Sequence, residues 1–276
     1  MSRGRAALGA FAPSWAGGWT PARWLFAAAQ AIEGTRQVRQ IADSFRHPEL
    51  NFGSGILHLS DRVLLPPALA WLLGGAVFVG LAGLGWGGRA ARPGLLLWML
   101  AELGLFAGLG WELNAPERIA GWCAVGLLLG PIGERDLTAR RRSPVGRWFF
   151  LLWMSAMYGM TGWLKVSREP GWLDGSILAQ ALLDPYLGGT DLGARIAAVP
   201  ALTTALSLAT ITFELSFPLL VGFAATNPAI VAAGLCFHVG VSSVLNLGTL
   251  GITVLSAYPV ILHPDAAERL WRAWRR

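Results

Sequence analysis

The sequence predicts an all-α protein: a polytopic integral membrane helical bundle with seven or eight membrane crossings and one short interfacial helix. Hydrophobic residues make up 54% of the 276 residues, only 14% are charged, and the mean hydropathy is +0.50. An average soluble domain carries roughly 25% charged residues. Several windows also reach the roughly 20 apolar residues that a helix needs to cross a bilayer. We therefore expect residues 1–276 to form a single transmembrane domain.

The first predicted helix covers residues 21–45 and is amphipathic. Thr20 is suited to cap its N-terminus, and Pro21 is suited to its first turn. At 100° per residue, polar side chains fall on one half of the helix and apolar side chains on the other. This pattern fits a helix lying in the membrane interface, and equally a crossing helix whose polar face looks into the bundle. The sequence leaves both readings open.

Loops and apolar runs alternate over the next part of the chain. Residues 46–62 are rich in turn-forming and polar residues and are expected to form an exposed loop. The apolar runs over 65–86 and 95–113 are long enough to cross a bilayer, whereas the run over 119–132 is shorter. Small residues at four-residue spacing in the two long runs allow helix backbones to approach closely. These pairs are Ala76 with Gly80 and Gly104 with Gly108.

The second half of the chain continues this alternation. Residues 148–164 form an apolar run that ends at Lys165. Residues 172–186 are too short to cross and predict a helix in the outer interface, which Asp174 can cap and Pro185 ends. Three apolar runs follow, with a turn at Asn227 and Pro228 between the first two. They cover residues 199–224, 229–247 and 250–262.

The placement of arginines predicts the orientation of the bundle. The net charge is +6 and the pI is about 10.3, but the arginines are spread over loop ends and form no recognised nucleic-acid motif. The densest basic cluster lies in the loop over residues 133–146, and cytoplasmic loops of membrane proteins carry an excess of Lys and Arg. We therefore expect a multi-pass protein of the cell membrane with both termini in the cytoplasm. Its partner is the lipid bilayer, and no nucleic-acid partner is expected.

The two cysteines give no sign of a metal site. Cys123 and Cys236 each lie inside an apolar run, without CxxC spacing. We expect both to be small buried residues.

Four polar side chains lie within apolar helices: Glu102, Lys165, Glu214 and His238. A charge near the bilayer centre costs roughly 2.5–3.5 kcal/mol on insertion scales, so such residues are candidates for function. Glu214 lies 12 residues before Thr226 and His238 lies 12 after it. A hairpin that turns there would set both about 18 Å from the turn. We therefore expect Glu214 and His238 to approach each other, by a direct hydrogen bond or through water, either as a structural pair or as a functional one.

Lys165 is the only lysine of the chain, since every other basic residue is an arginine. One interpretation is an anchor near the outer end of its helix, whose four-carbon stem reaches the interface. The other is a base, because a desolvated ammonium can lose its proton whereas a guanidinium cannot. Counting residues along each helix from its turn places Lys165 nearer the outer membrane surface than Glu214 and His238. Either its helix ends deeper than hydropathy suggests, or Lys165 works with Asn246, which lies at a similar level.

Three short sequence segments of the second half of the chain carry a resemblance to a known family. The first comprises Tyr158, Gly162, Lys165, Trp172 and Gly175, the second is FELSFPLL at 213–220, and the third is FHVGVSSVLNLG at 237–248. Together they resemble the "Y…G…K…W…G" segment and the next two helices of the horizontally transferred transmembrane (HTTM) family and of the related vitamin K-dependent gamma-carboxylase. The likeness is good over residues 145–262 and general over 20–140.

This resemblance implies a single HTTM-like domain with a site inside the membrane. In the carboxylase, the lysine that matches Lys165 acts as the base in hydroquinone epoxidation, which drives the carboxylation of protein glutamate. By carry-over, Lys165 would be the catalytic base, and a quinol would be the substrate or cofactor. His238 and Glu214 would complete the catalytic group, and the residues assigned to substrate binding are Asn246, Trp172 and Tyr158.

Two classes of function follow from these residues. The first is a membrane-embedded enzyme that uses a quinol or another lipid-phase substrate, with Lys165 as base. The second is a non-catalytic membrane partner in a peptide maturation, export or immunity system, which would bind a protein or peptide and use its buried polar groups structurally. Proton-coupled transport through Glu102, Glu214 and His238 is a third, although no inverted repeat is evident.

Overall fold

The computed structural model describes residues 14–46, 66–109, 115–133 and 141–274. This part of the chain is helical apart from one pair of two-residue strands, which confirms the all-α class. The predicted loop over 46–62 lies, beyond its first residue, outside the described residues. In chain order, the elements are β1 (Ser14–Trp15), α1 (Ala16–Arg46), α2 (Pro67–Trp86), η3 (Gly88–Ala90), α3 (Ala91–Leu109), α4 (Ala115–Leu128), β2 (Arg141–Arg142), α5 (Val145–Arg168), η4 (Pro170–Trp172), α6 (Ser176–Leu183), α7 (Asp191–Ala197), α8 (Pro200–Leu220), α9 (Asn227–Val244), α10 (Leu250–Leu255), α11 (Tyr258–Ile261) and α12 (Pro264–Trp274).

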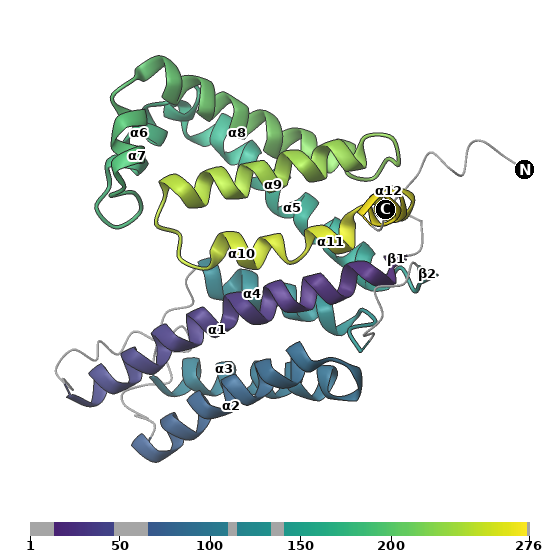
Figure 1. The fold of residues 1–276 in the computed structure, drawn as a ribbon. Coiled ribbons are helices and arrows are strands. Elements are labelled where there is room, and N and C mark those ends of the chain that lie inside the picture. The colour runs from purple at the N-terminus through teal and green to yellow at the C-terminus, as the bar shows by residue number, and fades with distance from the viewer. Residues whose placement is uncertain (1–13, 47–65, 110–114, 134–140, 275–276) are drawn as a thin grey trace, which may run out of the picture.

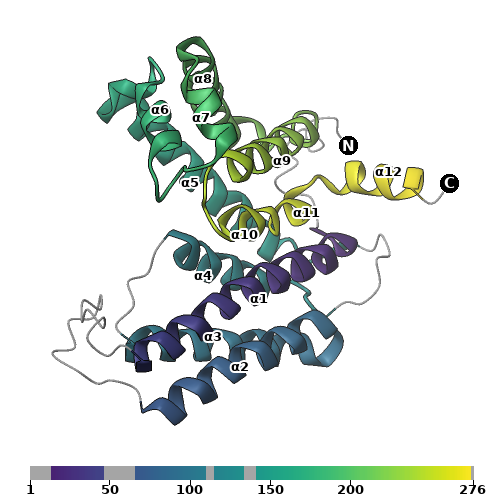
Figure 2. The same cartoon turned by 60° about the vertical axis from the view of Figure 1, so that its left-hand side comes forward.

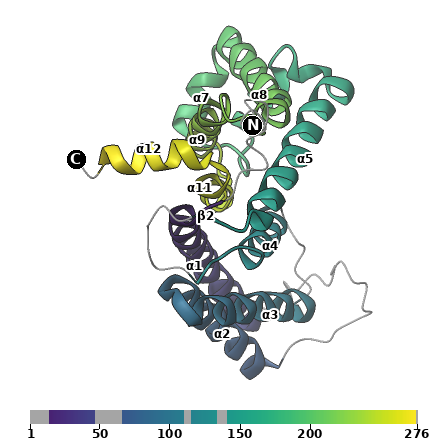
Figure 3. The ribbon, with the colours of Figure 1, turned by 90° about the vertical axis from the view of Figure 1, so that its right-hand side faces the viewer.

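The helices form two groups that meet along α10 and α11. Helices α5, α8 and α9 make the upper group in Figure 1, with α6 and α7 at its left-hand end, and α1 to α4 make the lower group. Helix α10 contacts α1, α4 and α9, whereas α11 contacts α1 and α5, so this pair joins the groups (Figure 2). Helix α12 is seen end-on in Figure 1 and lengthwise in Figure 3, and it therefore runs across the bundle.

Three of the described helices are long and apolar enough to cross a membrane. They comprise Ala68–Trp86, Pro200–Leu220 and Asn227–Val244, with mean hydropathies of 1.9, 1.3 and 1.4. Each coincides with a predicted crossing run. The structure therefore supports association of the chain with a membrane through these helices.

The described helices do not reach seven or eight crossings by this criterion. Helix α4 has only 14 residues, and α10 with α11 forms a shorter apolar stretch over Leu250–Ile261. Helices α1 and α5 have 31 and 24 residues, but charged and polar side chains lower their hydropathy. The count of seven or eight thus stays a prediction.

Helix α1 buries the uncharged and acidic side chains of its polar half, whereas Arg36 and Arg39 of that half are exposed. Gln30, Glu33 and Gln37 are 3%, 5% and 2% exposed, whereas Trp24 and Ile32 are 53% and 57% exposed. A surface helix of a soluble protein shows the opposite pattern. Of the two readings for residues 21–45, the one in which the polar face looks into the bundle agrees with this burial.

Helices α2 and α3 pack closely at small residues, as predicted for Gly80. A Cβ at Gly80 would lie 2.7 Å from the carbonyl oxygen of Gly94 and 2.7 Å from the backbone nitrogen of Trp98. Gly104 meets the side chain of Leu73, 3.1 Å from where its Cβ would lie. The small residues therefore set how near the two helices can approach.

Gly80→Ala is expected to destabilise the protein by about 1–3 kcal/mol, because the added methyl group meets backbone atoms that cannot rotate away. Gly85→Ala, in the same helix, is the matched control, because a Cβ there has no neighbour within 4 Å. That control should be neutral or more stable by up to about 1 kcal/mol, since alanine favours a helix over glycine. Thermal unfolding in detergent measures both variants, and equal stabilities would contradict the close packing.

The predicted short helix over 172–186 is found as α6, which covers only Ser176–Leu183 and has Gly175 rather than Asp174 at its N-cap position. Asp174 Oδ1 accepts the backbone N–H of Ser176 at 2.9 Å, ahead of the first turn of α6. This hydrogen bond lowers the pKa of the exposed Asp174 carboxyl below its usual value. Helix α6 ends just before Pro185, as expected. Helix α7, which Thr190 caps, is an additional short helix that the apolar pattern does not indicate.

Candidate functional site

One side of α5 faces α8 and supplies the first site residues, which are Tyr158, Thr161, Gly162 and Lys165. Three- and four-residue spacing places them on one side of the helix. A Cβ at Gly162 would lie 3.0 Å from the Cβ of Glu214, and one at Gly159 would lie 3.4 Å from Cγ of Pro218. Positions nearer the start of α5 thus meet positions nearer the end of α8, and the two helices are antiparallel.

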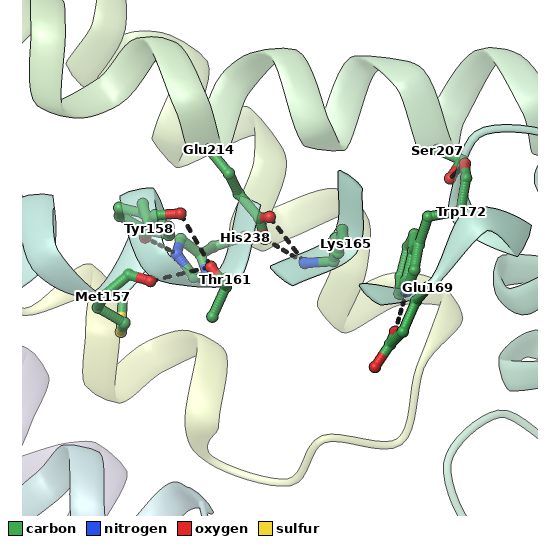
Figure 4. Close-up of polar contacts among 9 residues, drawn as sticks. All are labelled: Met157, Tyr158, Thr161, Lys165, Glu169, Trp172, Ser207, Glu214 and His238. Atoms are coloured by element: carbon green, nitrogen blue, oxygen red, sulfur yellow. Dashed lines mark hydrogen bonds and ion pairs between the residues drawn. The ribbon is translucent and has the colours of Figure 1, made fainter. Parts of the chain in front are cut away.

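Lys165 and Glu214 form an ion pair between α5 and α8. The Nζ of Lys165 donates to Oε1 of Glu214 at 2.6 Å and to Oε2 at 2.7 Å (Figure 4). The two side chains are only 16% and 6% exposed. Both contacts are charge-assisted hydrogen bonds, which are stronger than those between neutral groups. The pair therefore ties the two helices together and places one ammonium and one carboxylate inside the bundle.

The direction of the side chains explains why this pair forms. Lys165 lies three residues before Arg168, the last residue of α5. Side chains in a helix tilt toward the N-terminus of their own helix. In an antiparallel pair, Lys165 therefore leans back along α5 while Glu214 leans back along α8, and the two charged ends meet. Lys165 thus pairs with Glu214 rather than with Asn246, and its depth in a membrane stays a prediction.

Asn246 has no part in this pair. It is exposed, follows the end of α9 at Val244, and donates its backbone N–H to the carbonyl oxygen of Leu187 at 2.6 Å. Its place in a connecting segment, rather than in the helix wall, explains why counting along a helix misplaced it. A contact between Asn246 and a substrate stays a prediction.

Buried aromatic and imidazole groups form a second cluster around Tyr158. The Oη of Tyr158 lies 2.5 Å from Nε2 of His238 and 3.0 Å from Oη of Tyr258. The rings of Phe213 and Phe217 pack on Tyr158, with centroids 5.2 and 4.7 Å away. The cluster joins α5, α8, α9 and α11 through one tyrosine. His238 is thus held by a hydroxyl group within an aromatic wall.

A direct hydrogen bond between Glu214 and His238 is absent from the described hydrogen bonds, because each pairs with a residue of α5. Depth counting assumed a turn centred on one residue, but a six-residue turn separates Leu220 from Asn227. Glu214 lies six residues before the end of α8, about 9 Å, whereas His238 lies 11 residues after the start of α9, about 16 Å. The two residues therefore differ in depth.

Glu102 lies away from this site, in the lower group of helices. Gln37 Nε2 of α1 donates to Oε2 of Glu102 at 2.9 Å, and Gln30 Nε2 donates to Oγ1 of Thr253 at 3.0 Å. These hydrogen bonds join α1 to α3 and α10. Glu102 is therefore not brought together with Glu214 and His238, as a transport path through the three would require.

Sequence reasoning missed three residues around the site: Glu169, Ser207 and Tyr258. Ser207 lies seven residues before Glu214 on α8, so helical periodicity could have placed both on one face. Tyr258 is one of only three tyrosines and interrupts an apolar run, which is a weaker signal. Glu169 lies in the turn after α5, where no periodic pattern applies.

The cysteine, histidine and acidic residues that the structure describes are not grouped into a metal site. Within the ranges that the structure describes, no group of three or more His, Cys, Asp or Glu side chains is placed to hold a metal ion. Cys123 is buried, as predicted, but Cys236 is exposed. The expected burial of Cys236 is wrong, because that residue lies on the side of α9 that faces away from the bundle.

Comparisons with known proteins leave the family of this chain open. No protein-family model, no curated protein and no solved structure matches it. The resemblance to the HTTM family stays a prediction, and the function must be argued from the geometry of the site.

Proposed function

We propose that this chain is a membrane-embedded enzyme of the HTTM type, in which Lys165 removes a proton from a lipid-soluble hydroquinone. The ion pair of Lys165 with Glu214 carries the proposal. A lysine that only anchors a helix would extend its ammonium to the interface. The single lysine of this chain is instead 16% exposed and bonded to a carboxylate that is 6% exposed.

The pair provides a route for the proton that leaves Lys165. Transfer of one proton from Nζ to Oε1 of Glu214 turns the ion pair into an amine beside a carboxylic acid. Surroundings of low dielectric constant favour these neutral forms over separate charges. The amine can then accept the proton of a hydroxyl group that reaches it. An arginine at this position could not perform this step, because a guanidinium keeps its proton.

The surroundings of the pair suit an aromatic alcohol. The ring of Trp172 lies 4.7 Å from Nζ of Lys165, and in the neighbouring cluster around Tyr158 the ring of Phe213 stacks on Phe237 with centroids 4.9 Å apart. Such side chains bind flat aromatic ligands through stacked and edge contacts. We assign Trp172 and Tyr158 to this wall. A hydroquinone would supply the acidic hydroxyl and two electrons, and dioxygen would accept the electrons, whereas the chain supplies the base and its proton partner.

We further propose seven or eight crossings, with both termini in the cytoplasm. The burial of Gln30, Glu33 and Gln37 in α1 supports a crossing helix there. Strand β1 pairs with β2, with Ser14 opposite Arg142, so the start of the described chain lies beside the arginine-rich loop. Helix α12 lies at the same end of the bundle (Figure 1). The positive-inside tendency makes this end cytoplasmic.

Lys165→Arg tests the enzyme. In lipid nanodiscs with a naphthohydroquinone and dioxygen, the wild-type protein should oxidise the hydroquinone faster than empty nanodiscs do. The arginine variant should lose about 10²- to 10⁴-fold of this rate, the usual contribution of a positioned base. Arg168→Gln, at the exposed end of the same helix, is the control and should keep the rate. A wild-type rate in Lys165→Arg would exclude Lys165 as the base.

One observation favours the alternative, a non-catalytic partner for a protein or peptide in a maturation, export or immunity system. Both carboxylate oxygens of Glu214 are already bonded to Lys165, which is also what a purely structural tie between α5 and α8 requires. An arginine can form the same two bonds. This alternative therefore predicts that the Lys165→Arg variant keeps its function in the cell. It also predicts that neither the wild type nor the variant oxidises the hydroquinone faster than empty nanodiscs do.

A further inference from the structure

The turn after α5 places an aromatic ring against Lys165. The centroid of the Trp172 ring lies 4.7 Å from Nζ of Lys165, within the range of a cation–π contact. The indole N–H of Trp172 donates to Oε2 of Glu169 at 2.7 Å (Figure 4). The ammonium thus has the Glu214 carboxylate as one neighbour and the Trp172 ring as another.

The backbone of this turn is fixed to α8. Ser207 Oγ donates to the carbonyl oxygen of Trp172, and Thr204 Oγ1 donates to that of Asp174 at 2.6 Å. Gly175 has φ +81°, and a Cβ there would lie 2.5 Å from the backbone nitrogen of Thr204. These contacts fix where the Trp172 backbone lies, but they leave its side-chain torsions free. The hydrogen bond to Glu169 is the described contact that holds the indole edge.

We propose that Glu169 is a positioning residue, whose carboxylate holds the Trp172 ring over the ammonium of Lys165 as a cover on the site. The ring stabilises the charged form of Lys165 and limits the approach of reagents to Nζ. Glu169 itself is exposed and touches Lys165 only through Trp172. The inference rests on the proposed function only for the reaction at Lys165 that the ring would cover.

The single lysine allows a direct test on the full-length protein in nanodiscs. Acetic anhydride acylates neutral amines, and mass spectrometry of peptides separates Lys165 from the N-terminal amine. Glu169→Ala and Trp172→Ala should each raise the acylation rate of Lys165 about two- to fivefold, the loss expected for one partly exposed cation–π contact. Glu169→Gln keeps an oxygen that accepts the indole N–H and should react at the wild-type rate.

Trp163→Ala is the matched control, because Trp163 is 63% exposed and lies two residues before Lys165. It should leave the rate unchanged. Unchanged acylation in both Glu169→Ala and Trp172→Ala would overturn the proposal, and so would an equal rise in Glu169→Gln and Glu169→Ala, which would indicate a charge effect. The measurement uses no hydroquinone. A protein that shows the expected rates but no hydroquinone oxidation would therefore refute the enzyme and not the cover.

Discussion

Glu214→Gln is expected to lower the free energy of unfolding by about 3–5 kcal/mol, because it leaves the Lys165 ammonium inside the bundle without its counter-charge. Glutamine has nearly the shape of glutamate, so the loss reports the charge rather than packing. The Lys165 side chain is 16% exposed, so little water is near it to replace the carboxylate. Thermal unfolding in detergent micelles measures the change. A variant as stable as the wild type would show that the ion pair does not form.

The double variant Lys165→Met/Glu214→Leu is the control for this result. It removes both charges and fills their places with apolar side chains of similar size. Replacement of a whole buried pair is often neutral or stabilising, whereas removal of one partner is costly. The double variant should therefore unfold within about 1 kcal/mol of the wild type and far above Glu214→Gln. If the single and double variants are equally unstable, lost packing and not the unpaired charge is the cause.

Asn227→Ala is expected to cost about 2–4 kcal/mol of stability, since three hydrogen bonds of a fully buried side chain are lost. Asn227 Nδ2 donates to the carbonyl oxygens of Val221 and Ile261, at 2.9 and 3.1 Å, and its Oδ1 accepts the backbone N–H of His263 at 2.6 Å. These bonds join the turn before α9 to the end of α11. Without them, a buried N–H and two carbonyl groups lose a partner.

Asn246→Ala is the matched substitution for this test. Asn246 is exposed, and its described hydrogen bond uses the backbone, which alanine keeps. Its stability should stay within about 0.5 kcal/mol of the wild type. Thermal unfolding of the two variants in the same detergent compares them. Equal stabilities would show that the Asn227 side chain does not join these segments.

Composition and periodicity predicted the all-α class and the three helices that are long and apolar enough to cross a membrane. The three apolar runs that became α2, α8 and α9 needed only length and hydropathy. The turn between the last two lies before Asn227 rather than at it, and Pro228 marks the first turn of α9. The sequence could not decide whether the polar face of α1 meets water or other helices, because the amphipathic pattern is the same in both cases. Residues 250–262 divide into α10 and α11 around Ser256 and Ala257, and an apolar pattern carries no sign of that break.

The sequence predicted which residues belong to the candidate site but not which of them pair with one another. Lys165, Glu214 and His238 stand out by residue type, because charged and polar groups are rare in apolar helices. Their partners depend on the length of the turn before α9 and on the tilt of side chains in antiparallel helices. Neither follows from counting residues. Tyr158, recognised only through a resemblance, proved to be the partner of His238.

The most direct test of an intramembrane base is hydroquinone oxidation by the Lys165→Met/Glu214→Leu variant in nanodiscs. This variant keeps the apolar packing between α5 and α8 and removes only the groups that can carry a proton. We predict a protein that unfolds at nearly the wild-type temperature and oxidises the hydroquinone no faster than empty nanodiscs do. A stable double variant that oxidises it at the wild-type rate would contradict the account, because the pair would then be a structural tie alone.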